Sequence, residues 1–284
     1  MNHAPTALPI SALHALHLYG AAGITAFGWA MCGLVGWDAG PWMPLWFCSA
    51  LLIYNADRLR SDPADAVNVP ARVAAGARLR RVSAAIAFAA ALVLVALPLA
   101  RRDWLTLGLV IAGAFTCLGY SLPLLGWRWK DVPLLKSFMA PTVVAAAIFG
   151  LPWLHEGPPA ESALLIPTAL RAWVFLLFNM LLCDLRDIAG DTRAGVRSVP
   201  VALGERRTRG LLWVLLAVVE GLALTALHTA SPAHARVWLL LSIGAPLYLG
   251  ALIVAVRRPR SEGFYEWWVE GMLFLPALAV WTAG

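Results

Sequence analysis

Long apolar segments recur along the whole 284-residue chain and constrain its fold more than any other feature. A helix needs about 20 mostly apolar residues to cross the roughly 30 Å of hydrocarbon in a bilayer. Nine segments meet this need, at residues 11–36, 41–60, 82–100, 104–122, 133–152, 163–184, 210–229, 236–256 and 266–282. None alternates apolar and polar residues as membrane-barrel strands do. The sequence predicts an all-α, polytopic membrane protein whose nine transmembrane helices form a single domain over residues 1–284.

Composition favours a membrane protein over a water-soluble one. Charged residues make up 13% of the chain, whereas soluble domains carry about 25%. The net charge of +6 is interpreted by position, because basic residues beside membrane helices report orientation and not a nucleic-acid surface. We therefore expect no nucleic-acid partner. The four cysteines form no CxxC or Cys/His cluster, so neither a zinc site nor a disulfide framework is expected.

The positions of the basic residues predict the orientation in the membrane. Of the 22 Lys and Arg residues, 18 follow or end the second, fourth, sixth and eighth apolar segments. Cytoplasmic connections are enriched in Lys and Arg. We therefore expect the N-terminus in the cytoplasm and the protein in a bacterial plasma membrane.

The strongest candidate site is the acidic cluster Asp184-Leu185-Arg186-Asp187-Ile188-Ala189-Gly190-Asp191, which ends the sixth apolar segment. On a helix, Asp187 and Asp191 lie at about −60° and −20° from Asp184, so the three carboxylates share one face. Like charges at this spacing repel one another, and a divalent cation between them would remove the repulsion. Oxygen ligands without His or Cys favour Mg²⁺, which usually also binds substrate phosphates.

A second polar cluster, residues 54–65, ends the second apolar segment on the same side of the membrane. One helical face would gather Asn55, Arg58, Asp62 and Asp65, and a neighbouring face would gather Tyr54, Asp57, Ser61 and Asp65. Pro63 argues against a regular helix here, so both registers stay open. Either cluster alone could be a solvated cap of Asp and Arg side chains. Together, two acidic clusters edged by basic residues would suit Mg²⁺ ions bridging a diphosphate.

In these residues the chain resembles the UbiA superfamily of intramembrane prenyltransferases. The cluster at 184–191 is similar to the second Asp-rich motif of the family. Two more similar stretches are Gly119-Tyr120-Ser121-Leu122-Pro123, followed by Arg128-Trp129-Lys130 and Leu135-Lys136, and Ser198-Val199-Pro200-Val201-Ala202-Leu203-Gly204. The resemblance implies a nine-helix bundle whose second and sixth helices carry Asp-rich motifs that hold Mg²⁺ and an isoprenyl diphosphate.

The resemblance also implies roles for individual residues. The implied catalytic residues are Asp57, Asp62, Asp184, Asp187 and Asp191, and these acids together with Asp65 are the implied Mg²⁺ ligands. The implied substrate-binding residues are Asn55, Arg58, Tyr120, Arg128, Lys130, Lys136 and Arg193. Tyr120, Trp173, Phe175 and Phe178 are expected to stabilise a carbocation with their ring faces. The implied reaction ionises an isoprenyl diphosphate and transfers the prenyl group to an aromatic, quinone-type or lipid acceptor.

Two departures from the family pattern leave alternatives open. In the first motif of the family, Asn and Asp residues recur every four positions, whereas in this chain those positions are Ile53, Asp57, Ser61 and Asp65. Either Asp62 substitutes from an adjacent position or one metal ion is held by fewer carboxylates. Many members carry an Arg early in the first helix, where this chain has His14 and His17. That change favours a terpene cyclase, which needs no acceptor, whereas transferases are more numerous in the family. A secondary transporter is a third hypothesis, weakened by the absence of internal repeats.

Arg171, Glu220 and Glu270 are charged residues that fall inside predicted membrane spans. Charge at membrane depth is costly unless it is paired or neutralised. We expect Arg171 to extend its side chain towards the outer surface of the membrane. For Glu270, packing and catalytic roles are both possible.

Overall fold

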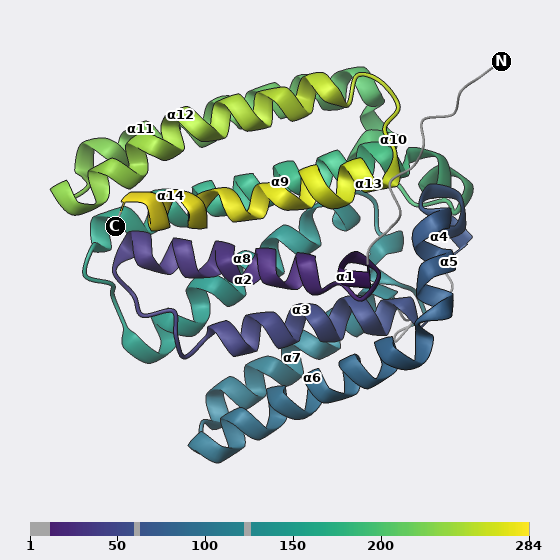
Figure 1. The fold of residues 1–284 in the computed structure, drawn as a ribbon, viewed down its shortest axis with the longest axis horizontal. Helices are drawn as coiled ribbons and strands as arrows, with labels where there is room; N and C mark the ends of the chain where they lie inside the picture. Colours follow the sequence, from purple (N-terminus) through teal and green to yellow (C-terminus); the bar gives the residue numbers. More distant parts are fainter. Residues whose placement is uncertain (1–11, 60–62, 122–125, 284) are drawn as a thin grey trace.

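A computed structural model of the chain describes residues 12–59, 63–121 and 126–283, and all regular elements within these ranges are helical (Figure 1). The first half contains α1 (Ala12–Ala15), α2 (Leu18–Val35), α3 (Met43–Arg58), α4 (Pro63–Asn68), α5 (Pro70–Arg78), α6 (Arg80–Arg101), α7 (Trp104–Ser121) and η1 (Trp129–Asp131). The second half contains α8 (Leu135–Glu156), α9 (Ser162–Arg193), α10 (Val199–Leu203), α11 (Glu205–Thr229), α12 (Pro232–Ala255), α13 (Glu262–Phe264), η2 (Tyr265–Val269), η3 (Glu270–Phe274) and α14 (Leu275–Ala283). The predicted all-α fold is confirmed for the described residues.

Six helices are long and apolar enough to cross a membrane, which makes the chain a polytopic membrane protein. They are α2, α6, α8, α9, α11 and residues His234–Ala255 of α12. The predicted spans 41–60, 104–122 and 266–282 are also helical where described, but their helices are shorter or irregular. Nine spans and a cytoplasmic N-terminus therefore remain predictions.

Large apolar side chains cover the outside of the bundle. Phe88 of α6, Ile166 of α9 and Leu247 of α12 are 68%, 69% and 71% exposed. Apolar faces of this size are uncommon on soluble monomers, but they suit contact with lipid tails.

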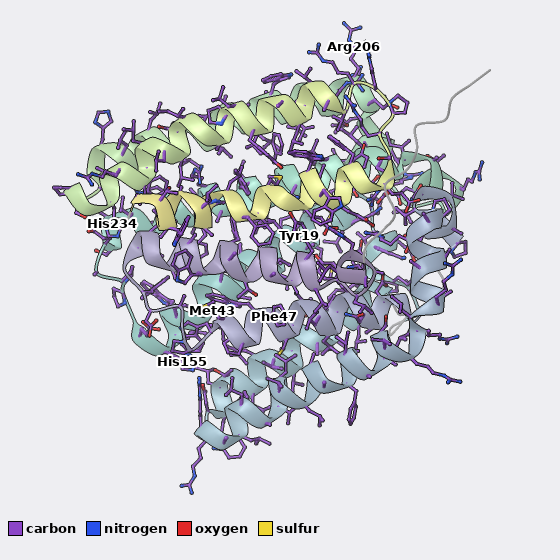
Figure 2. All side chains as sticks on the ribbon, viewed as in Figure 1. Tyr19, Met43, Phe47, His155, Arg206 and His234 are labelled. Carbon is purple, nitrogen blue, oxygen red and sulfur yellow. The ribbon has the colours of Figure 1, made fainter. Side chains whose placement is uncertain are left out.

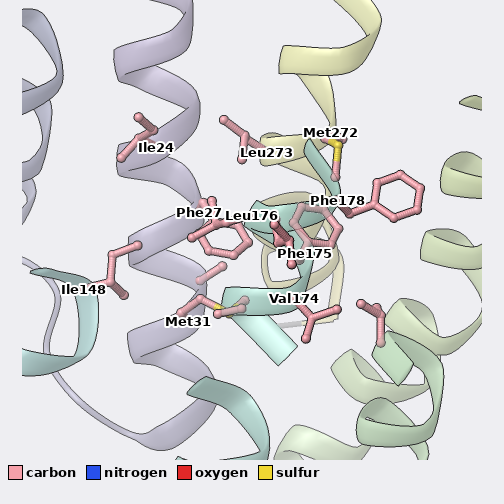
Figure 3. Packing of buried hydrophobic residues seen from close by; sticks show 14 of the residues in the cluster. Ile24, Phe27, Met31, Ile148, Val174, Phe175, Leu176, Phe178, Met272 and Leu273 are labelled. Atoms are coloured by element: carbon pink, nitrogen blue, oxygen red, sulfur yellow. The ribbon is translucent and has the colours of Figure 1, made fainter. Parts of the chain in front are cut away.

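Helix α9 lies at the centre of the bundle and packs against α2, α8 and α11 (Figure 1). The α11–α12 hairpin forms one edge of the molecule, and α6 with α7 forms the opposite edge. Where α2 meets α9, Phe27 stacks on Phe175 with ring centroids 5.4 Å apart, and Met31, Phe178 and Met272 pack nearby (Figure 3). This apolar core holds α9 in place relative to its neighbours.

Two predicted spans are interrupted by local irregularities. The first breaks between α1 and α2, where His17 adopts a left-handed conformation with φ of 57°. The last contains the π-helix η2, in which three carbonyls accept side-chain hydrogen bonds from other helices. The pairs are Trp267 O with Tyr19 (3.3 Å), Trp268 O with Tyr248 (2.7 Å) and Val269 O with Asn179 (2.8 Å). These long-range bonds stabilise an irregular turn that apolar periodicity does not predict.

Candidate functional site

The candidate site lies at the C-terminal end of α9. This helix has 32 residues and is about 48 Å long, so it exceeds the roughly 30 Å of membrane hydrocarbon. Its last turns carry Asp184, Asp187 and Asp191 in one continuous helix, as their predicted common face requires. Asp184 and Asp191 are 0% and 2% exposed. Carboxylates buried to this degree need compensating charge or hydrogen bonds.

The three acids converge on one cation, the ammonium group of Lys136 in the first turn of α8. Its Nζ lies 2.6 Å from an Asp191 oxygen, 3.4 Å from Asp184 Oδ1 and 3.9 Å from Asp187 Oδ2. Lys136 is therefore next to the acids, where a substrate-binding residue would be expected. A single ammonium group balances only one of the three negative charges.

Ser137, the residue after Lys136, is a further contact that the sequence analysis missed. Its hydroxyl donates to Asp184 Oδ2 at 2.5 Å and accepts from the Val199 backbone N–H at 3.1 Å. Ser137 thereby joins the acidic face of α9 to α10. Its position directly after a predicted substrate-binding lysine was the only sequence signal available.

Arg186 and Arg72 bring positive charge to Asp187, although Arg72 also pairs with Glu270 at 3.9 Å. Arg186 Nε donates to Asp187 Oδ1 at 2.7 Å, and its guanidinium lies over the Tyr265 ring, 5.2 Å from the centroid. Arg72 of α5, which the sequence analysis did not single out, interacts electrostatically with Asp187. The Glu262 carboxylate accepts both N–H groups of Ala71 and Arg72 at 2.9 Å, which fixes the start of α5.

The 54–65 cluster is not one helix, as Pro63 suggested. Helix α3 ends at Arg58 and α4 begins at Pro63, so neither predicted helical register runs through the cluster. Helix α4, which contains Asp65, packs directly on the acidic end of α9. The contact is close at Gly190, whose N–H donates to Asn68 Oδ1 at 2.8 Å. A Cβ on Gly190 would lie only 2.5 Å from the Ala64 carbonyl oxygen.

Tyr120 lies within electrostatic range of both acidic clusters. It interacts electrostatically with Lys136, Asp184 and Asp191, and also with Asp57 of the first cluster. The structure therefore brings Tyr120, Lys136, Asp57 and the acids of α9 into one region at the end of the bundle.

Within the described part of the chain, the other predicted site residues do not share the contacts of the α9 acids with Lys136. Asn55 is fully buried, and its Nδ2 donates to the carbonyls of Leu16 (3.0 Å) and Leu51 (2.9 Å), where it supports the break before α2. Arg193 is exposed at the end of α9, and Lys130 lies in η1. Asp62 and the Arg58 side chain lie outside the described residues.

Arg128 makes a forked contact with a neighbouring acid in its own loop. Its Nε and Nη2 lie 2.9 and 2.7 Å from the two oxygens of Asp131. These hydrogen bonds hold the pKa of Asp131 below its ordinary value. The Arg128 guanidinium, which was predicted to bind the substrate, therefore binds Asp131 of the same loop.

The chemistry of these residues suits a divalent cation, whereas their described arrangement is not yet that of a metal site. The acids offer only oxygen ligands, and among the described residues the buried Asp184 Oδ1 has no hydrogen-bond partner, although Lys136 Nζ lies 3.4 Å away. Within the described ranges, no three His, Cys, Asp or Glu side chains are placed to hold one metal ion. The Lys136 ammonium is the cation on which the α9 carboxylates converge.

The structure corrects the expectation for Arg171 and shows packing roles for two aromatic residues. Arg171 is 1% exposed, so it does not extend towards the membrane surface. Its guanidinium lies 5.7 Å from the centroid of the Trp238 ring, because α11 and α12 cover this face of α9. Phe175 and Phe178 are fully buried in the apolar core.

The chain is similar to one protein family and to two named proteins. A family model described as the UbiA prenyltransferase family matches residues 56–275. The 33 kDa chain of bacteriochlorophyll synthase from Rhodobacter capsulatus is 27% identical over 177 residues, 57% of each chain. Lycopene elongase/hydratase from Haloferax volcanii is 31% identical over 187 residues, 62% of this chain and 52% of that protein. The chain thus spans little more than half of the relatives it matches. No solved structure matches significantly.

Proposed function

Because the chain belongs to the UbiA prenyltransferase family, we propose that it ionises an isoprenyl diphosphate beside α9 and transfers the prenyl group to an apolar acceptor. The observation that carries this proposal is the convergence of Asp184, Asp187 and Asp191 on Lys136. The proposed reaction is Mg²⁺-dependent and takes place at the cytoplasmic side of a bacterial plasma membrane, within a single domain of nine spans.

Ionisation breaks the allylic C–O bond and leaves a carbocation and a diphosphate, whose charge has to be neutralised. Lys136, already beside the acids, would bind oxygens of that diphosphate. Three carboxylates by themselves repel an anion, so the site needs more positive charge than Lys136 and Arg186 supply. Mg²⁺ held by the acids of α9 and by Asp57, Asp62 and Asp65 would supply that charge.

The acceptor is proposed from chemistry and from the names of the relatives. The prenyl cation reacts with an electron-rich carbon or oxygen, and the acceptor then loses a proton. Aromatic, quinone-type and other lipid acceptors are apolar and would be available from the membrane that surrounds the helices. The relatives are named for bacteriochlorophyll and for lycopene, so apolar pigments belong among the acceptors to be tested.

The test uses the purified full chain in lipid vesicles with farnesyl or geranylgeranyl diphosphate and Mg²⁺, and measures pyrophosphate release and extracted products. We expect release that requires both an acceptor and Mg²⁺ and that stops when EDTA is added. The variant Asp187→Asn should abolish release, whereas Asp131→Asn, the same change in the loop before α8, should not. A cyclic hydrocarbon formed without acceptor would identify a terpene cyclase instead. Absence of release under all conditions would overturn both activities.

A further inference from the structure

A groove on the outer face of the α11–α12 hairpin shares no lining residue with the acidic site. It has a volume of about 800 Å³ and runs along α12 past Leu247, Gly250 and Val254, with Trp213 of α11 on its other side. A side chain at position 250 would extend towards Trp213, because the edge of that ring lies 3.7 Å from where a Cβ on Gly250 would be. We call this region the basic groove, since it ends at Arg257, Arg258 and Arg260.

The walls of the basic groove are apolar and face the surroundings of the bundle. Leu247 is 71% exposed, Val254 is 50% exposed and Trp213 is 43% exposed. Both helices are long and apolar enough to cross a membrane, so these walls face lipid. The occupant therefore needs an apolar chain that can lie along α12.

The end of the basic groove carries concentrated positive charge. Arg257, Arg258 and Arg260 are exposed, and neither Arg257 nor Arg258 is in an ion pair within the described part of the chain. Arg260 is held in place by a hydrogen bond from its Nε to the Ala255 carbonyl (2.7 Å) and by the Phe264 ring. The nearby acid Glu262 is used at the start of α5.

The adjoining start of α11 carries further arginines, which do not line the basic groove. Because α11 and α12 are antiparallel, Arg206 and Arg207 lie at the same end of the hairpin, where Arg206 points outwards (Figure 2). Glu205 is paired with Arg209 at 2.9 Å and does not neutralise the other arginines. Arginines beside a membrane helix attract anionic lipid headgroups.

We propose that the basic groove binds one anionic phospholipid, with an acyl chain along α12 and the headgroup phosphate on Arg257, Arg258 and Arg260. An apolar channel that ends in arginines matches both parts of such a lipid. A zwitterionic lipid would match the channel equally well but would gain less from the arginines. The site does not depend on the proposed reaction, because no acid of α9 takes part in it.

The test measures lipid retention by native mass spectrometry of the detergent-purified full chain, with phosphatidylglycerol or phosphatidylcholine added. We expect one phosphatidylglycerol to be retained in preference to phosphatidylcholine. The double variant Arg257→Gln/Arg258→Gln should weaken phosphatidylglycerol binding about 30-fold. The matched control Arg206→Gln/Arg207→Gln removes the same charge from the same end of the hairpin, but outside the groove, and should change binding less than about twofold.

A third variant, Gly250→Leu, keeps the arginines and fills the channel, and it should also lose the lipid. Thermal unfolding of each variant checks that the fold is intact. Equal losses in the two arginine variants would overturn the proposal, because general charge would then explain binding. Retention of both lipids alike would also overturn it, as would displacement of phosphatidylglycerol by farnesyl diphosphate, which would make the groove a substrate-tail site.

Discussion

Helix α9 buries charge in two regions that differ in how the charge is compensated. At its C-terminal end, Asp184, Asp187 and Asp191 meet Lys136 at 2.6–3.9 Å. About four helical turns earlier, Arg171 is 1% exposed, and none of its three guanidinium nitrogens has a hydrogen-bond partner in the described structure. The first region gathers charges from several helices, whereas the second isolates one.

The surroundings of Arg171 explain why it does not form a comparable cluster. The Trp238 ring lies against its guanidinium, and Glu220 of α11 interacts with it electrostatically but forms no ion pair within 4.0 Å in the described structure. A buried charge without close partners is an energetic cost to the fold. The comparison teaches that burial of a charge does not by itself indicate a site, and the proposed function rests instead on the convergence of like charges on one point.

The largest effect is expected from Asp191→Asn. This change keeps the size of the side chain but removes a carboxylate that contacts Lys136 at 2.6 Å. We expect turnover to fall by at least about 100-fold, because diphosphate neutralisation depends on the whole cluster. Pyrophosphate release measures this effect, and thermal unfolding in the same vesicles checks the fold. Full activity in a folded variant would move the diphosphate site away from α9.

Lys136→Met tests the cluster without any assay of turnover. Loss of this ammonium leaves three buried carboxylates with less compensation, which should cost about 3–5 kcal/mol of stability when divalent cations are absent. Added Mg²⁺ should raise the unfolding temperature of the variant more than that of the wild type. Equal stability of the two proteins in EDTA would contradict the electrostatic role of Lys136.

Gly190→Ala tests whether α4 must approach the acids closely. The added Cβ would lie 2.5 Å from the Ala64 carbonyl oxygen and the Asn68 Oδ1, so α4 has to shift. We expect a loss of about 1–3 kcal/mol of stability together with reduced turnover. The control is Gly221→Ala in α11, where a Cβ meets nothing within 4 Å. Helix propensity there should stabilise the protein by up to about 1 kcal/mol.

Arg171→Met sharpens the contrast between the two regions of α9. Because the guanidinium has no hydrogen bonds to lose, an apolar side chain of similar length should leave stability within about 1 kcal/mol of the wild type. Turnover should also be unchanged. A loss as large as that expected for Lys136→Met would show instead that Arg171 compensates Glu220 strongly.

The smallest effect is expected at the exposed pair of Arg128 and Asp131, whose side chains are 28% and 40% exposed. The pKa of Asp131 is lower in the folded protein than its ordinary value of 3.8. The pair therefore stabilises fully above that value, and its contribution disappears as the pH falls through the lower folded pKa. Solvent screening limits it to at most about 0.5 kcal/mol. Asp131→Asn should lower the unfolding temperature slightly at neutral pH, and a difference that grew with acidification would contradict this sign.

The two acidic clusters differ in how much of their structure could be predicted from the amino-acid sequence. The common face of Asp184, Asp187 and Asp191 depends only on the helical repeat, and α9 is continuous through all three residues. The register of the 54–65 cluster could not be assigned, because α3 ends at Arg58 and a new helix begins at Pro63. The contact of Asn68 with Gly190 depends on the packing of α4 against α9.

The sequence by itself determined the helical membrane architecture, because apolar segments of sufficient length have to satisfy their backbone hydrogen bonds internally in lipid. It also determined which acids of α9 share a face, since that is a local property of the helix. Only the tertiary structure decided that Lys136 and Ser137 meet those acids and that Arg171 is enclosed by Trp238. Such contacts join helices tens of residues apart, and their distances follow from packing, which no local pattern encodes.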